Sequence, residues 1–416
     1  MAIKISKEQY SPALFDLSRD VYGGLPIKLV ERWLDTERAD DDAVRLLKEY
    51  EVQGYSVSSD SAGLTSLTGR KGLMEILALI NRPKEIVYAY GAAIGGHGVG
   101  IWAADNTQML YPASTGADIL LSTLLTVQDE ITRGCQVRIG IGAHFGNFYH
   151  LSGGLYGVEA DAIEDIAEND TAGGEIAVSQ SVVDRLPPDH SFTLEPKDIV
   201  PTAVGAMYRV LDGPPLVDVQ PSDGQYPLPY SEEFYTDLLS YERCLDDTGF
   251  AQQLADKYMR HKTVVLIERQ AQGSATQRPA LLDALALSAM MKDVGLRHLP
   301  PDDGIEVKVA GPLGIYLFDE PAVAVRFAQE FRQELAARNI VCRIGIDHGP
   351  VLFGELSGGG MDIAGMPVNI ASKMAQDIGR PGRMYLSEAI QERVDVAGFE
   401  RIRYTVSGIQ MAAFEG

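Results

Sequence analysis

The chain has little of several residue types, and each shortage excludes a class of protein. Among its 416 residues are three cysteines, Cys135, Cys244 and Cys342, which is too few for a disulfide framework. A reducing cytoplasm is therefore the expected location. The sequence shows no run of about 18 apolar residues and no basic start followed by an apolar stretch, so neither a membrane span nor a signal peptide is expected.

Basic residues are also scarce. The 36 Lys and Arg against 58 Asp and Glu give a formal net charge of −22. Nucleic-acid backbones and anionic membranes are bound through basic patches, so we expect neither as a partner. A Mg²⁺-nucleotide remains compatible with an acidic surface. The length predicts two to three domains, and 45% hydrophobic residues suffice for ordinary cores.

An internal repeat is the most informative feature of the chain. Cys135 precedes Val-Arg-Ile-Gly-Ile and, further on, Gly-Glu-Ile-Ala-Val-Ser at 174–179. Cys342 precedes Arg-Ile-Gly-Ile and then Gly-Arg-Met-Tyr-Leu-Ser at 382–387, about 205 residues later. A repeat of this length predicts two copies of one domain. The apolar frame is kept while the polar residues differ, so each copy is expected to supply its own part of a shared site.

The organisation follows from this repeat. Short β-rich runs alternate with helical segments, which predicts an α+β or α/β arrangement, and Ala322 to Arg338 has the spacing of an amphipathic helix. Tyr230-Ser-Glu-Glu-Phe resembles Tyr10-Ser-Pro-Ala-Leu, so the repeat includes a helical entry. The expected segments are a helical lead-in at 1–50, a first domain at 51–212, a Pro-rich linker with a second lead-in at 213–260, and a second domain at 261–416.

Several of these segments resemble a known family. Asp362-Ile-Ala-Gly-Met-Pro-Val-Asn-Ile-Ala-Ser-Lys-Met374 closely resembles the signature of class III nucleotide cyclases, the adenylyl and guanylyl cyclase catalytic domains. Arg-Ile-Gly-Ile-Asp-His-Gly-Pro-Val351 and the opening Ser59-Asp-Ser-Ala-Gly-Leu-Thr are similar to two further family segments. The resemblance implies an α+β fold of two tandem cyclase-like domains, each with a ferredoxin-like βαββαβ core. It also implies that they form a pseudo-two-fold pair within the chain, with helical lead-ins outside the resemblance.

The resemblance implies metal-assisted chemistry, in which two Asp residues of one domain hold two metal ions. Asp60 matches the first of these residues, and Mg²⁺ or Mn²⁺ is the implied cofactor. The second Asp is expected after an Ile-Gly pair, where this chain has Gly96 with His97 beside it. One metal site is therefore expected and the second is in doubt. His97 is a poor Mg²⁺ ligand, and a Gly-rich hairpin tip is the alternative interpretation.

The opposite side of the site is implied by the second domain. Lys308 and Asp362 match the residues that bind the adenine edge, Asn369 matches the residue that binds the ribose, and Lys373 replaces the usual Arg. Lys can donate to adenine N1 while Asp accepts from the exocyclic amine, so ATP is favoured over GTP. Lys keeps the charge of Arg but loses its bidentate geometry.

The reciprocal site lacks its functional groups. Glu268 and Pro312 stand at the two metal positions of the second domain. In the first domain the positions for Asn, Arg, Lys and the base-binding Asp are assigned to Asp161, Asp165, Ala92 and Gly154. Carboxylates at the first two of these positions would repel a triphosphate. The chain is thus expected to have one nucleotide site.

Two functions remain open. The first is an adenylyl cyclase that converts ATP to cyclic AMP and pyrophosphate, with weak activity. The second is an inactive pseudo-cyclase that binds ATP or another purine nucleotide as a regulator or scaffold. An unrelated α/β enzyme is a third alternative. The lead-ins are candidates for self-association or for binding a protein partner.

Overall fold

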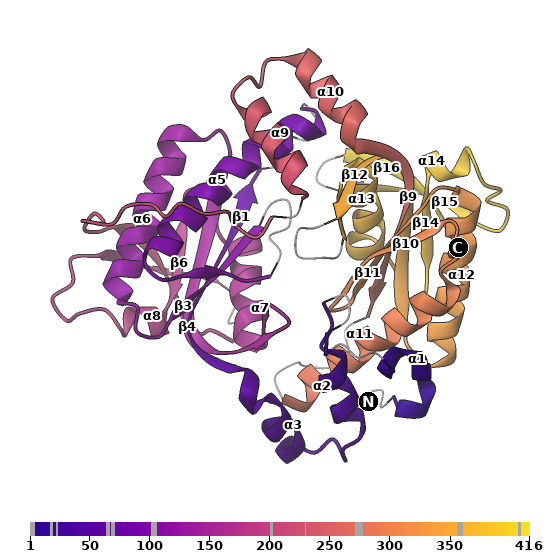
Figure 1. Cartoon of the computed structure of the whole chain (residues 1–416), viewed down its shortest axis with the longest axis horizontal. Helices are drawn as coiled ribbons and strands as arrows, with labels where there is room; N and C mark the ends of the chain where they lie inside the picture. The colour runs from indigo at the N-terminus through magenta and orange to yellow at the C-terminus, as the bar shows by residue number, and fades with distance from the viewer. Residues whose placement is uncertain are drawn as a thin grey trace. The chain divides into compact units, whose positions relative to one another are not determined.

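The computed structural model describes residues 5–16, 20–21, 24–63, 67, 71–100, 106–199, 203–228, 230–270, 278–355, 361–406 and 409–416. Its contacts divide the chain into two compact units. The first unit is Leu47–Leu254, and the second unit combines Met1–Leu46 with Ala255–Gly416. Figure 1 colours the chain from indigo at the N-terminus to yellow at the C-terminus.

The first unit is built on an eight-stranded mixed sheet with the order β2-β3-β1-β4-β6-β8-β7, and β5 pairs with β4. Its central strand β1 is antiparallel to both neighbours, whereas β4 and β6 are parallel. The strands are β1 (Glu51–Ala62), β2 (His97–Gly98), β3 (Asn106–Pro112), β4 (Arg138–Leu151), β5 (Gly154–Tyr156), β6 (Ile176–Ser179), β7 (Thr193–Lys197) and β8 (Met207–Asp212).

Helices cover both faces of this sheet. The long helices α5 and α6 lie on one face and α7 lies on the other (Figure 1). The apolar residues of α6 recur at helical spacing and are buried, which explains why this segment is a helix. The helices are α5 (Leu73–Ala93), α6 (Ala117–Gly134), α7 (Val158–Asp165) with the π turn η3 (Ile166–Asp170), α8 (Gln180–Val183), α9 (Glu232–Glu242) and α10 (Thr248–Tyr258).

The second unit has an eight-stranded sheet of the same connectivity, β10-β11-β9-β12-β14-β16-β15, with β13 paired to β12. The expected amphipathic helix at 322–338 is confirmed as α12 (Pro321–Ala337). The strands are β9 (Met259–Arg269), β10 (Gly304–Ala310), β11 (Leu313–Phe318), β12 (Cys342–Glu355), β13 (Met361–Ala364), β14 (Met384–Ser387), β15 (Glu400–Val406) and β16 (Ile409–Glu415). The chain is thus a mixed α+β protein with two sheets.

The helices of the second unit come from both ends of the chain. Those that follow its first strand are α11 (Arg278–His298), α12, α13 (Met366–Ser372) with the π turn η4 (Lys373–Asp377), and α14 (Glu388–Gln391). The N-terminal ones are η1 (Lys7–Gln9), α1 (Pro12–Phe15), α2 (Ile27–Leu34) and α3 (Asp40–Leu47), and the turn η2 (Lys48–Tyr50) leads into β1. No helix of the described segments is both long and apolar enough to cross a bilayer.

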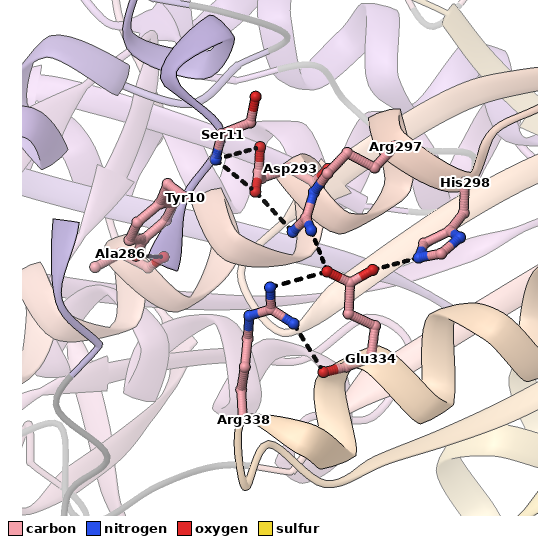
Figure 2. Close-up of polar contacts among 8 residues, drawn as sticks. All are labelled: Tyr10, Ser11, Ala286, Asp293, Arg297, His298, Glu334 and Arg338. Carbon is pink, nitrogen blue, oxygen red and sulfur yellow. Dashed lines mark hydrogen bonds and ion pairs between the residues drawn. The ribbon is translucent and has the colours of Figure 1, made fainter. Parts of the chain in front are cut away.

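The N-terminal lead-in packs on the unit that contains the C-terminal sheet. Tyr10 donates its hydroxyl to the carbonyl of Ala286 at 2.8 Å, and the backbone N–H of Ser11 donates to Asp293 at 3.1 Å (Figure 2). The indole N–H of Trp33 donates to Asp283 at 2.9 Å. All three acceptors lie on α11, so this helix is the platform for the first lead-in.

Ion pairs hold the same platform against α12. Asp293 is 1% exposed and also pairs with Arg297 at 2.8 Å. Glu334 of α12 accepts hydrogen bonds or ion pairs from Arg297, His298 and Arg338 (Figure 2). Because a buried carboxylate is costly without such partners, the lead-in contributes to the stability of the network by supplying a donor to Asp293.

The second lead-in packs in the reciprocal way, on α5 of the first unit. Tyr226 donates its hydroxyl to the fully buried Asn81, and Tyr235 of α9 donates to Glu85 at 2.7 Å. Asn81 and Glu85 lie on the same face of α5, four residues apart. Each lead-in therefore precedes the sheet of one unit along the chain but packs on the other unit. The sequence alone does not indicate this arrangement.

Strand pairing aligns the two units differently from the shared Arg-Ile-Gly-Ile motif. Ile141 pairs with Ile176 of β6, and Ile344 pairs with Met384 of β14. Since Ile176 and Met384 match in the repeat, Ile141 and Ile344 occupy equivalent places. The alignment that sets Arg-Ile-Gly-Ile at 138 beside the same letters at 343 is therefore wrong by two residues.

The close packing of α7, which follows β5, and of α13, which follows β13, supports the same alignment of the two units. A Cβ on Gly142 would lie 3.1 Å from the carbonyl oxygen of Ile163, and a Cβ on Gly345 would collide with the carbonyl of Ala371. Ile163 and Ala371 are themselves equivalent in the repeat. Only glycine lets the helix approach the strand this closely, which fixes the two glycines as a matched pair.

Candidate functional site

Asp60 lies near the end of β1, in the middle of the first sheet. It is opposite Asn106 of β3 and Gly140 of β4. Its side chain is partly exposed and lines a cavity of ≈180 Å³ within the first unit. A carboxylate at a strand end beside open space is suited to a hard cation.

The equivalent carboxylate in the second sheet has a different neighbour. Glu268 of β9 is opposite Arg343 of β12, and the two side chains form an ion pair. By strand register, Arg343 stands where Gly140 stands in the first sheet. The Arg343 charge offsets that of Glu268, so a second cation at Glu268 would be repelled by the guanidinium. Glycine supplies no such charge opposite Asp60.

The alternative interpretation of the Gly-rich stretch around Gly96 as a hairpin tip is wrong, and the position of a second metal ligand stays a prediction. Gly96 precedes the β2–β3 hairpin, in which His97 pairs with Leu110 and Gly98 with Met109. The hairpin turn therefore lies beyond residue 99, and Gly96 is not at its tip. A Cβ on Gly96 would lie 2.7 Å from Tyr111 Cδ1, so glycine is required there for packing.

Asp105 comes directly before β3 in the sequence, and its placement lies outside the described residues. In the described segments, no group of three or more His, Cys, Asp or Glu is arranged to hold a metal.

Ala92 is also misassigned. It lies in helix α5, whereas Lys308 lies in strand β10. The pairing of His97 with Leu110 and of Ile305 with Leu317 makes β2 the equivalent of β10, so the counterpart of Lys308 falls at Val99 or Gly100. Neither Val99 nor Gly100 supplies a basic side chain at this place.

Lys308 and Asp362 lie on two strands that contact each other. Lys308 is an exposed residue of β10, and Asp362 is a half-buried residue of β13 opposite Gly354. The two strands share an apolar cluster that includes Val307, Ile363 and the partly buried residues around them. This cluster positions the strands that carry the two polar side chains.

Asn369 and Lys373 follow on α13 and the turn after it. Asn369 is exposed on α13, and Lys373 is the first residue of the π turn η4. Lys373 Nζ lies 3.7 Å from Asp377 Oδ2. A π turn inside a helix is often found at a functional site because it displaces one side chain from the regular spacing. The first unit has the same feature, with Asp161 in α7 and Asp165 directly before η3.

His144 of β4 forms a Ser-His-Glu arrangement with Ser179 and Glu159, although the sequence indicated none. His144 Nδ1 lies 2.8 Å from Ser179 Oγ, and Nε2 lies 3.4 Å from Glu159 Oε2. Ser179 is fully buried and His144 is 4% exposed. A substrate cannot reach this serine, so the arrangement is structural. Its counterpart in the second sheet is Asp347, which accepts a hydrogen bond from Ser387.

Comparison with known proteins assigns part of the chain. Residues 313–412 match the model of the adenylate and guanylate cyclase catalytic domain. No curated protein gives a significant match. Similar solved structures include an adenylate/guanylate cyclase/hydrolase from Silicibacter pomeroyi, at 22% identity over 38% of this chain and 96% of that chain, with a TM-score of 0.31.

Two further structures are of the same kind. The guanylate cyclase domain of RhGC from Catenaria anguillulae in complex with GTP is 19% identical over 37% of this chain and 94% of its own, with a TM-score of 0.30. The adenylyl cyclase CyaB from P. aeruginosa is 16% identical over 38% and 93%, with a TM-score of 0.31. The family match thus shows that residues 313–412 are similar to the adenylate and guanylate cyclase catalytic domain.

Proposed function

We propose that the chain is an adenylyl cyclase with one composite nucleotide site, which converts ATP to cyclic AMP and pyrophosphate slowly. The first unit would supply the metal side through Asp60, and the second unit would supply the base and ribose side. The observation that carries the proposal is the asymmetry across the strands. Asp60 faces a glycine, whereas the equivalent Glu268 is paired with Arg343.

The residues of the second unit have complementary roles in this proposal. Lys308 would donate to adenine N1, and Asp362 would accept from the exocyclic amine. Asn369 would bind the ribose, and Lys373 would stabilise the charge that develops on the phosphates. Lys373 already lies near Asp377, and it presents a single ammonium group instead of a bidentate guanidinium. This favours slow turnover.

Asp60 fits a Mg²⁺ or Mn²⁺ ion because its carboxylate is a hard oxygen ligand beside a cavity. A bound metal would neutralise charge on the triphosphate and polarise its oxygens. Among the described residues, Asp60 is the carboxylate that β1 provides for this role. The proposal thus depends on Asp60.

The alternative is a pseudo-cyclase that binds a nucleotide without turnover. Lys373 in place of Arg favours it, because this change lowers the stabilisation of the transition state more than the binding of the ground state. Binding of ATP together with undetectable cyclic AMP formation would establish this alternative.

Matched variants test the metal assignment. The full-length chain is incubated with ATP and either Mg²⁺ or Mn²⁺, and cyclic AMP is measured. We expect turnover below about 1 s⁻¹, the lower end of ordinary enzymes. Asp60→Asn should reduce it at least tenfold, whereas Glu268→Gln, at the equivalent place in the other unit, should leave it within about twofold. Equal losses in both variants would contradict the assignment to Asp60.

A further inference from the structure

Two histidines of the first unit lie close to each other on neighbouring parts of the sheet. The ring centroids of His97 on β2 and His150 on β4 are 6.2 Å apart, and the rings are tilted by 49°. The backbone N–H of Gly100 donates to the carbonyl of Gly153, which ties the end of β2 to the turn after β4. His97 is exposed and His150 is half-buried, so a solute can reach both rings.

The second unit has apolar side chains at the same two places. Ile305 is the counterpart of His97, because their partners on the next strand are equivalent. Phe353 is the counterpart of His150, since each lies nine residues after the matched isoleucine of its strand. Ile305 and Phe353 both pack against the apolar cluster of the second unit. The two positions therefore differ together, apolar in one unit and imidazole in the other.

The separation of the two rings fits one shared metal ion. An imidazole nitrogen binds Zn²⁺ at about 2.0–2.1 Å, so two ring centres on one ion are at most about 6 Å apart. The observed separation is at this limit, and a small rotation of the exposed His97 ring brings both rings onto one ion. Burial and the neighbouring His150 lower the pKa of His97, so the neutral imidazole that binds metals predominates at pH 7.

A pair of histidines in the second unit provides a comparison. The ring centroids of His261 and His348 are also 6.2 Å apart. However, His348 Nδ1 lies 3.0 Å from the hydroxyl of Thr263. Burial and the positive charge of Arg393 lower the pKa of His348, and this guanidinium would also repel a metal ion. The pair in the first unit is therefore the better metal site.

We propose that His97 and His150 together bind one late first-row divalent cation, of which Zn²⁺, Ni²⁺ and Cu²⁺ are examples. Imidazole suits these metals, whereas Mg²⁺ prefers oxygen ligands. Water completes the coordination, because no group of three or more His, Cys, Asp or Glu in the described part of the chain is arranged for a metal.

This site is separate from Asp60 and does not depend on nucleotide turnover. Asp60 is opposite Asn106 of β3, whereas His97 is opposite Leu110, four residues or about 13 Å further along the same strand. The ion would link β2, at the edge of the sheet, to β4. Because it binds the folded state, it should stabilise the first unit.

The test is calorimetry with Zn²⁺ on the full-length chain, in an excess of Mg²⁺ that occupies oxygen sites. We expect one Zn²⁺ to bind at the histidine pair and to raise the melting temperature. Electron paramagnetic resonance of the chain loaded with one Cu²⁺ should show two nitrogen ligands. Absence of Zn²⁺ binding, or a Cu²⁺ spectrum without nitrogen ligands, would overturn the proposal.

Variants locate the ion. His97→Ile and His150→Phe introduce the residues of the second unit, and each should weaken Zn²⁺ at least tenfold and leave one nitrogen ligand on Cu²⁺. His261→Ala removes a histidine of the other pair and should bind as the wild type does. If His97→Ile binds Zn²⁺ as the wild type does, or if His261→Ala weakens it equally, the proposal is wrong. His97→Ile decides if His150→Phe does not fold, because the His97 side chain is exposed.

Discussion

At the residue scale, the side chain on the neighbouring strand decides what a carboxylate can bind. Asp60 and Glu268 are equivalent in the two sheets, yet only Glu268 faces an arginine. Glu268 and Arg343 are both partly buried, and their ion pair holds the guanidinium beside the carboxylate. Glu268 therefore contributes to the stability of the second sheet. The same chemical group is thus structural in one unit and a candidate ligand in the other.

A second residue-scale prediction concerns nucleotide preference. If Lys308 and Asp362 bind the adenine edge, Asp362→Ala removes the acceptor for the exocyclic amine. Loss of one buried polar partner costs on the order of 1–3 kcal/mol, so the preference of the wild type for ATP over GTP should be about tenfold or more and should vanish in the variant. Calorimetry with both nucleotides measures it. A wild type that binds GTP equally or more tightly contradicts the assignment.

Asp347 should make the stability of the second unit depend on pH. Burial raises the pKa of Asp347 to about 6, although the hydrogen bond from Ser387 opposes this shift. Because the folded pKa lies above the unfolded one, the protonated form is favoured by folding. Its contribution is fully present below about pH 4, is lost as the pH rises to about 6, and stays lost above it.

Asp347→Asn should therefore remove this loss. We expect the variant to be more stable than the wild type at pH 7, by on the order of 2–3 kcal/mol, and similar to it near pH 4. Denaturant unfolding at several pH values measures the difference. A variant that is destabilised equally at both pH values would show that the carboxylate is ionised and well solvated in the folded state.

At the element scale, the lead-in helices have a packing role in the units. The apolar side of α2 is buried within the chain through Ile27, Leu29, Val30, Trp33 and Leu34. This surface is used for packing against α11, so it is not available for the self-association that the sequence suggested. A partner of the lead-ins would have to use their exposed side.

Trp33 gives a test of this packing. It is fully buried, and its indole N–H donates to Asp283. Trp33→Ala should destabilise the second unit by about 3–5 kcal/mol, because it leaves a cavity between α2 and α11. Trp33→Phe keeps most of the packing and loses the hydrogen bond, so a smaller loss is expected. Thermal unfolding compares the two, and equal small losses would mean that the lead-in contributes little.

At the scale of the whole molecule, the chain passes from one unit to the other at Leu46–Leu47 and again at Leu254–Ala255. We predict that the two sheets form a pseudo-two-fold pair, in which Asp60 and Asn369 belong to the same site of the same chain. The constant spacing of 208 residues between Asp60 and Glu268 and between Asp161 and Asn369 motivates this prediction.

Mixing inactive variants tests whether the site is within one chain. Asp60→Asn and Asn369→Ala should each lose cyclic AMP formation. A mixture of the two should remain inactive if both residues act within one chain, because neither chain is complete. Recovery of about a quarter or more of the activity on mixing would show that the site forms between two chains instead. The single-chain double variant serves as the inactive reference.

The sequence alone determined the mixed α+β class, and it predicted the division into two copies and the residues that resemble a cyclase site. These follow from local patterns, because hydrophobic spacing fixes each element and a 13-residue signature carries its own polar side chains. It also indicated the amphipathic helix at 322–338, which is α12. Asp60, Lys308, Asp362, Asn369 and Lys373 could be named for the same reason.

Tertiary structure alone decided the register of the strands and the interaction partners of the polar side chains. The shared Arg-Ile-Gly-Ile letters are two residues out of structural register, because strand pairing and the approach of α7 and α13 depend on distant residues. The pairing of Glu268 with Arg343, the place of Gly96 before β2, and the polar layer at Ser56 and Ser58 follow from the observed strand pairing. The sequence also did not indicate that the first lead-in packs on the second unit. This packing depends on hydrogen bonds between residues more than 200 positions apart in the chain.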